Sequence, residues 1–205
     1  MSVLVLISGR GSNLEALLRA GIPVSAVISS VPGARGLAIA SDRGVPTAVV
    51  DHRGYATREA FDAGLAEQIE RFAPRLVVLA GFMRIMTPAL VRRYADRMLN
   101  IHPSLLPAFP GTRTHERALA AGVKIHGCSV HFVTAELDAG PIVIQAAVPV
   151  RQGDSADALA ARVLRQEHVV YPRAVHWFLE GRLKLGDGKV EVEGGDAQLV
   201  YSGDD

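Results

Sequence analysis

The chain has 205 residues, of which 49% are hydrophobic and 21% are charged, and its formal net charge is +1. This composition is typical of a soluble globular protein long enough to bury a core, and the near-neutral charge argues against a nucleic-acid-binding or membrane-surface protein. The single cysteine, Cys128, cannot form an internal disulfide, so we expect a buried, inert thiol. The opening "MSVLVLISGRG" has no basic region, and its apolar run is too short for a signal peptide or a span. We therefore expect a cytoplasmic protein.

The first half of the chain alternates between apolar runs and segments with helical spacing. The runs at 3–8, 24–30, 47–51 and 76–81 predict strands, and those at 3–8 and 76–81 are continuously apolar, as in strands buried on both faces. Between the runs, helices are predicted up to Gly21, over 34–44 and over 57–74. This order predicts an α/β, Rossmann-like fold with a mostly parallel central sheet flanked by helices.

The second half is less regular. A helix is predicted over 88–99, two antiparallel strands over 128–134 and 141–150, and one long helix over 157–181 that contains Pro172. We expect residues 183–205 to be a peripheral tail with an edge strand at 189–194 and frayed final residues. Since no linker divides the chain, we expect a single domain over 1–205 with an antiparallel C-terminal part.

The glycine-rich stretch "SGRGSN", residues 8–13, lies between a predicted strand and a predicted helix, where helix N–H groups favour an anion. It is not a dinucleotide fingerprint, because Leu14 replaces the third glycine and no acid ends the next strand. It is not a P-loop either, because no Gly-Lys-Ser/Thr sequence follows the glycines. Two interpretations remain: a cradle for one phosphate, with Ser12 and Asn13 adding donors, or a plain turn capped by Ser or Asn.

The stretch "LNIHPSLLPAFPG", residues 99–111, places two polar side chains one residue apart just before a turn. In an extended chain Asn100 and His102 point to the same side, and Asp138 lies in the loop between the later strands. Each has an ordinary interpretation, as a turn Asn, a core His and a turn Asp. Together an amide, an imidazole and a carboxylate suit acyl chemistry without a covalent nucleophile. The sequence has no Gly-x-Ser-x-Gly elbow, Cys128 lies in an apolar run, and the other histidines lack metal-ligand spacing.

Four motifs occur in one order: "LISGRGSNLEALL", "VVLAGFMRIMTP", "NIHPSLLPAFPG" and "GCSVHFVTAELDAGPIVIQAAVPV". Over about residues 3–182 they resemble the phosphoribosylglycinamide formyltransferase family, folate-dependent enzymes of purine synthesis. The opening "SGRGSN" favours this branch over other folate formyltransferases, and "PGTRTHERAL" matches it more loosely. The resemblance implies formyl transfer from 10-formyltetrahydrofolate to glycinamide ribonucleotide. The alternatives are another formyl acceptor, hydrolysis of the formyl donor, or a non-catalytic protein that binds a phosphorylated metabolite.

The resemblance also implies a role for particular residues. Asn100 and protonated His102 would stabilise the oxyanion, His102 would deliver a proton, and Asp138 would orient the imidazole and favour its charged form. The phosphate would be held by Gly11, Ser12 and Asn13, and the rest of the ribonucleotide by Gln166, Glu167 and His168. The folate would contact Arg58, Met83, Arg84, Ile85, Met86, Asn100, Thr134, Ala135, Glu136, Leu137 and Asp138. Without the resemblance, Arg58 and Glu167 would be solvated helix residues, and Met83 and Met86 core. We expect no metal, nucleic acid or membrane partner, and a monomer or homodimer.

Overall fold

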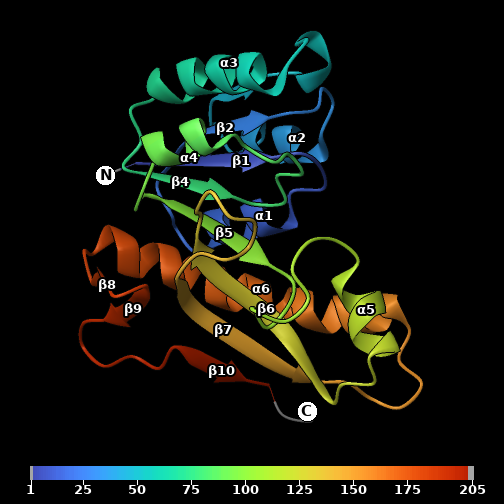
Figure 1. The fold of residues 1–205 in the computed structure, drawn as a ribbon. Helices are drawn as coiled ribbons and strands as arrows, with labels where there is room; N and C mark the ends of the chain where they lie inside the picture. The colour runs from blue at the N-terminus through green and yellow to red at the C-terminus, as the bar shows by residue number, and fades with distance from the viewer. Residues whose placement is uncertain (1, 203–205) are drawn as a thin grey trace. The chain divides into compact units, whose positions relative to one another are not determined.

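The computed structural model describes residues 2–202, which form two compact units, one ending at Asn100 and the other beginning at Ile101. Strand β5 (Met98–His102) carries the chain from the first unit into the second (Figure 1). No helix within residues 2–202 is both long and apolar enough to cross a membrane.

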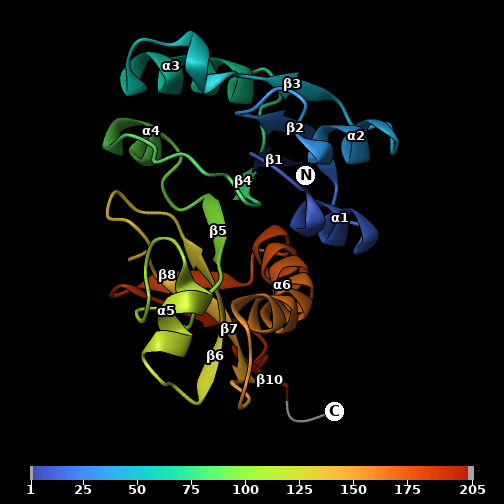
Figure 2. The same cartoon turned by 90° about the vertical axis from the view of Figure 1, so that its right-hand side faces the viewer.

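The first unit is a parallel sheet of strands in the order β5-β4-β1-β2-β3. Its strands β1 and β4 are buried along their whole length, because both faces carry apolar side chains. The chain first adds β2 and β3 on one side of β1 and then β4 and β5 on the other. With right-handed crossovers, this order places α1 and α2 on one face of the sheet and α3 and α4 on the other (Figure 2). The elements are β1 (Val3–Ile7), α1 (Ser12–Arg19), β2 (Val24–Ser29), α2 (Arg35–Ser41), β3 (Thr47–Val49), the 3₁₀ turn η1 (His52–Gly54), α3 (Arg58–Glu70), β4 (Leu76–Leu79) and α4 (Pro88–Arg93).

The last helix of the first unit ends well before the sequence predicts. The helix predicted over 88–99 ends at Arg93, and Asp96 has a φ of 59° that no helix permits. Met98 and Leu99 instead pair with Val77 and Val78 as part of β5. The prediction over 94–99 was wrong because pairing with β4, which is not visible in the local pattern, decides the conformation.

The second unit contains the predicted antiparallel pair, β6 (Ile125–Phe132) and β7 (Ile142–Pro149). The long helix α6 (Ala156–Leu179) packs against both strands and continues through Pro172. The short helix α5 (Thr114–Ala120) lies in a segment for which the sequence predicts no element.

The tail of the second unit is more ordered than expected. The strand predicted over 189–194 is β9 (Lys189–Val192), which pairs with β8 (Leu183–Gly186) in a separate antiparallel sheet. A strand that the sequence does not predict, β10 (Leu199–Tyr201), adds in parallel to β7. The last of the residues expected to be frayed, 203–205, lie outside the described residues.

Candidate active site

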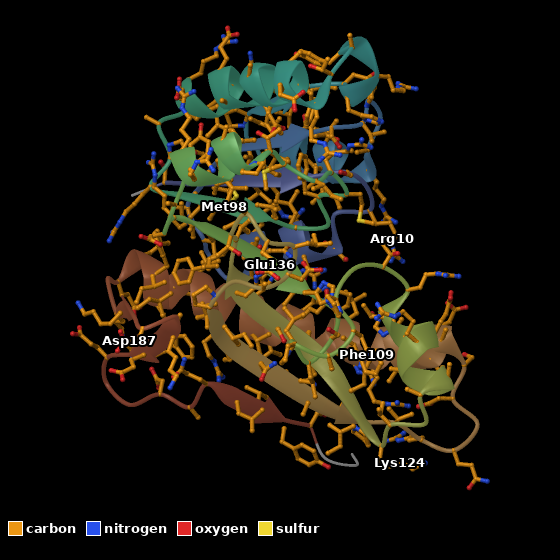
Figure 3. All side chains as sticks on the ribbon, viewed as in Figure 1. Arg10, Met98, Phe109, Lys124, Glu136 and Asp187 are labelled. Carbon is orange, nitrogen blue, oxygen red and sulfur yellow. The ribbon has the colours of Figure 1, made fainter. Side chains whose placement is uncertain are left out.

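His102 is the last residue of β5, and its imidazole is buried. The ring atom Nε2 lies 3.0 Å from the carbonyl oxygen of Phe109, in the loop that follows (Figure 3). Because a carbonyl only accepts, Nε2 must carry the hydrogen in this contact. The other ring nitrogen, Nδ1, takes no part in this contact.

Asp138 faces that second nitrogen from the loop between β6 and β7. Its Oδ2 atom lies 3.5 Å from Nδ1 of His102 and accepts a hydrogen bond of 2.8 Å from the backbone N–H of Gly111. The Asp138 side chain is only 8% exposed, and its backbone has a φ of 53°. The structure thus brings together two side chains that the sequence singled out, a buried imidazole and a buried carboxylate.

A second histidine, His131 of β6, lies on the other side of the carboxylate, with Nε2 3.9 Å from Oδ1 of Asp138. Burial is the main cause that lowers the pKa of His131, and its Nδ1 donates to the carbonyl of Phe132. His131 is therefore a neutral neighbour of Asp138. Sequence reasoning missed this residue; the available signal was its position near the end of a strand that leads into the Asp138 loop.

Asn100 precedes His102 by two residues in the same strand and is half-buried. Residues at this spacing in a strand point to the same face, as the sequence predicts. Asn100 and His102 therefore occupy alternate positions of one strand, the first at the end of the first unit and the second at the start of the second unit.

In the first unit, the glycine-rich loop connects β1 to α1. Gly11, with a φ of 79°, is the residue before the helix, so neither Ser12 nor Asn13 is the cap that the plain-turn interpretation requires. A side chain at Gly11 would place its Cβ 2.6 Å from the Cα of Gly36, whose N–H donates to the carbonyl of Gly9. The close approach and the positive φ both demand glycine here.

This loop leads directly into the N-terminus of α1. The first turn of α1 directs backbone N–H groups toward the carboxyl edge of the sheet. Arg10, between the two loop glycines, is exposed and adds a positive charge that sequence reasoning did not single out (Figure 3).

Ser8, which follows β1, forms hydrogen bonds with residues that follow β2 and β4. Its hydroxyl lies 2.7 Å from that of Ser30 at the end of β2 and accepts a hydrogen bond of 2.9 Å from the N–H of Met83. Its own N–H donates to the carbonyl of Gly81 after β4. The segment beginning at Gly81 is therefore held at the carboxyl edge of the parallel strands, where ligands of such sheets bind.

The model of the formyl transferase family matches residues 1–175 of the chain. The chain belongs to the formyl transferase family. It is 49% identical over 200 residues to phosphoribosylglycinamide formyltransferase of Escherichia coli (strain K12), covering 95% of this chain and 94% of the relative. It is 46% identical over 191 residues to the trifunctional purine biosynthetic protein adenosine-3 of Bos taurus, of which it spans only 19%.

A solved structure agrees with these sequence relationships. The crystal structure of phosphoribosylglycinamide formyltransferase from Anaplasma phagocytophilum matches with a TM-score of 0.93 and 44% identity, covering 99% of each chain. The family resemblance and the α/β fold with a mostly parallel sheet, both predicted from the sequence, are confirmed.

The remaining predicted residues of this formyl transferase occupy different environments. Met83 is 68% exposed and Ile85 58%, so Met83 is not the core residue of the ordinary interpretation, whereas Met86 is buried. Arg84 is exposed, and so is Arg58, the first residue of α3. The loop before Asp138 is exposed as well, and Figure 3 labels Glu136 within it. Its residues are Thr134, Ala135, Glu136 and Leu137.

On α6 of this formyl transferase, Gln166 and His168 are half-buried, whereas Glu167 is only 7% exposed. The interpretation of Glu167 as a solvated helix residue is therefore wrong. Burial, and next the nearby charge of Glu167, raises the pKa of the buried Cys128 thiol. That thiol stays protonated, as the prediction of an inert cysteine requires. Within residues 2–202, no three His, Cys, Asp or Glu side chains are grouped as metal ligands.

Proposed function

We propose that this formyl transferase moves the formyl group of 10-formyltetrahydrofolate to the amine of 5'-phosphoribosylglycinamide, giving the N-formyl product and tetrahydrofolate, in de novo purine biosynthesis. The observation that carries the proposal is the buried His102–Asp138 pair, with Nδ1 of His102 3.5 Å from the carboxylate, in a chain 49% identical to a phosphoribosylglycinamide formyltransferase. The formyl donor acts as a co-substrate.

The reaction needs no covalent intermediate on the protein. The amine nitrogen attacks the formyl carbon, a C–N bond forms, and the carbonyl oxygen becomes an oxyanion. The Asn100 amide and protonated His102 stabilise this charge, a role that supplies about 3–4 kcal/mol per donor in well-studied sites.

Proton transfer completes the exchange. Because Nε2 of His102 is engaged by the Phe109 carbonyl, the proton that moves is the one on Nδ1. It passes to the folate nitrogen as the old C–N bond breaks. The proton lost by the attacking amine restores His102, with Asp138 balancing the imidazolium charge throughout.

Substrate binding is assigned by similarity to the family. Gly11, Ser12 and Asn13 hold the phosphate, supported by the left-handed Gly11 and the adjacent helix N-terminus. The rest of the ribonucleotide contacts Gln166, Glu167 and His168. The folate contacts Arg58, Met83, Arg84, Ile85, Met86, Asn100, Thr134, Ala135, Glu136, Leu137 and Asp138.

The two units act as one formyltransferase domain in this proposal. The protein works in the cytoplasm on two small molecules, as a monomer or homodimer, with no metal, nucleic acid or membrane partner. Each catalytic step is assigned to a side chain of the protein itself.

A transfer assay with a panel of acceptors tests the proposal. The purified protein is mixed with 10-formyltetrahydrofolate and, in turn, glycinamide ribonucleotide, an amino sugar phosphate, methionyl-tRNA or no acceptor, and tetrahydrofolate release is followed. We expect release with glycinamide ribonucleotide alone. Release without any acceptor would indicate a hydrolase, release with another acceptor a different transferase, and no release a binding protein.

A further inference from the structure

We propose that Arg117 of α5 is a positioning residue for the His102–Asp138 pair. It acts by holding the loop segment 109–111, whose backbone contacts both members of the pair. The inference rests on the proposed function, because it takes His102 and Asp138 as the groups that perform the chemistry.

The segment 109–111 connects the two side chains through its backbone. The carbonyl of Phe109 accepts from Nε2 of His102 at 3.0 Å, and the N–H of Gly111 donates to Oδ2 of Asp138 at 2.8 Å. A displacement of this short segment would therefore change the orientation of the imidazole and of the carboxylate together.

The conformation of this segment is unfavourable by itself. Phe109 has a φ of 54°, in the left-handed region that a bulky aromatic residue rarely adopts, so this conformation carries a free-energy cost. Contacts from outside the segment must supply that free energy. The Phe109 ring packs edge-on against the buried ring of His126, with 5.9 Å between centroids.

Arg117 supplies the contact from the other side. Its Nη1 donates to the carbonyl of Pro110, and its guanidinium carbon lies 5.7 Å from the centroid of the Phe109 ring. The helix that carries Arg117 is itself tied to the end of β5, because Thr114 Oγ1 donates to the carbonyl of Pro103 at 2.7 Å. Arg117 thus joins the segment to a helix that is tied to the residue following His102.

An arginine is suited to this double contact for a physical reason. The planar guanidinium can lie over an aromatic ring while one of its N–H groups donates to a carbonyl in a fixed direction. A lysine at this position could donate to Pro110 but would lose the planar contact with Phe109. A methionine would lose both contacts and retain only an apolar stem.

The consequence for His102 is a fixed tautomer. With Phe109 in place, the neutral ring carries its hydrogen on Nε2, so that Nδ1 is the atom that gains and loses the reacting proton. When the segment is loosened, the neutral ring divides between two tautomers and a range of orientations. Misplacement of a catalytic group by about 1 Å costs up to about a hundredfold in rate.

The experiment compares three variants of the full chain. Arg117→Met removes both contacts, Arg117→Lys retains one donor, and Lys124→Met is the control. Lys124 is an exposed cation of the same unit, labelled in Figure 3, and its loss changes the net charge equally. Each protein is labelled with ¹⁵N in its histidine rings, and the His102 nitrogens are observed in the ligand-free state. Single-turnover rates and the KM values of both substrates are measured in parallel.

We expect wild type and Lys124→Met to have the Nε2–H tautomer of neutral His102, and Arg117→Met to have a mixture. In Arg117→Met we expect kcat to fall at least about tenfold with both KM values within about twofold, and Arg117→Lys to recover part of the loss. An unchanged His102 spectrum in Arg117→Met would overturn the inference, whatever its turnover. So would equal effects of Arg117→Met and Lys124→Met.

Failure of the proposed function has a separate signature. If His102→Ala retained full turnover, the catalytic assignment would fail, yet the tautomer prediction would still be decided by the spectra of the ligand-free Arg117 variants. Should Arg117→Met fail to fold, Arg117→Lys provides the same spectral comparison with one contact removed.

Discussion

Replacing Asp138 with asparagine removes a charge while leaving the shape and the backbone contacts of the side chain in place. The amide oxygen of Asn can still accept from the N–H of Gly111, which now binds Oδ2 at 2.8 Å. Asparagine also tolerates the left-handed backbone at this position, where φ is 53°. The variant therefore tests the charge of Asp138 and little else.

The size of the effect follows from the distance between the charges. With an effective dielectric constant of about 20, a carboxylate and an imidazolium 3.5 Å apart attract by about 5 kcal/mol. The amide dipole recovers part of this, which leaves a net loss of about 3–4 kcal/mol and a fall in kcat of roughly 10²–10³-fold. His131 does not compensate, because burial lowers its pKa and it remains neutral.

Single-turnover formyl transfer at neutral pH measures this loss, and dissociation constants for both substrates separate it from binding. Asp157→Asn, at an exposed position in the first turn of α6, is the matched control for loss of one negative charge. We expect the control to keep wild-type rates. Turnover in Asp138→Asn within about threefold of wild type, with both ligands bound normally, would refute the coupling, since the estimated loss is far larger.

Three further predictions concern the glycine loop and two buried groups. Gly11→Ala should weaken ribonucleotide binding at least about tenfold and leave folate binding unchanged in calorimetric titrations, because its Cβ would lie 2.6 Å from the Cα of Gly36. His126, whose pKa is lowered from 6.5 to about 4 mainly by burial, is neutral in the fold but takes up a proton when unfolded. The free energy of unfolding should therefore fall by about 3 kcal/mol as the pH drops from about 6.5 to about 4, and urea titrations of His126→Leu should lack this part of the dependence. Cys128, buried and with a raised pKa, should react with a disulfide reagent only after denaturant unfolds the chain.

Local patterns in the sequence were sufficient for much of the fold. Continuous apolar runs identified β1 and β4, because a strand buried on both faces has no polar side to interrupt the pattern. The spacing of Asn100 and His102 likewise indicated a shared face, since side chains alternate along any strand. These features depend only on neighbours in the chain.

Pairing between distant segments was decided by the tertiary structure. The end of the helix predicted over 88–99 became part of β5 because Met98 and Leu99 found partners in β4. Strand β10, with no strong pattern of its own, exists because it adds to the edge of β7. Strand formation depends on what lies alongside, and a single segment does not carry that information.

The same division holds for the candidate site. The sequence grouped His102 with Asp138 by their chemistry and by resemblance, but only the folded chain brings Nδ1 within 3.5 Å of the carboxylate. The groups that orient the pair, the Phe109 carbonyl and the Gly111 N–H, belong to the backbone, so residue identity does not encode their role. Every residue but proline carries the same backbone donor and acceptor, and only tertiary structure determines which of them meets a catalytic side chain.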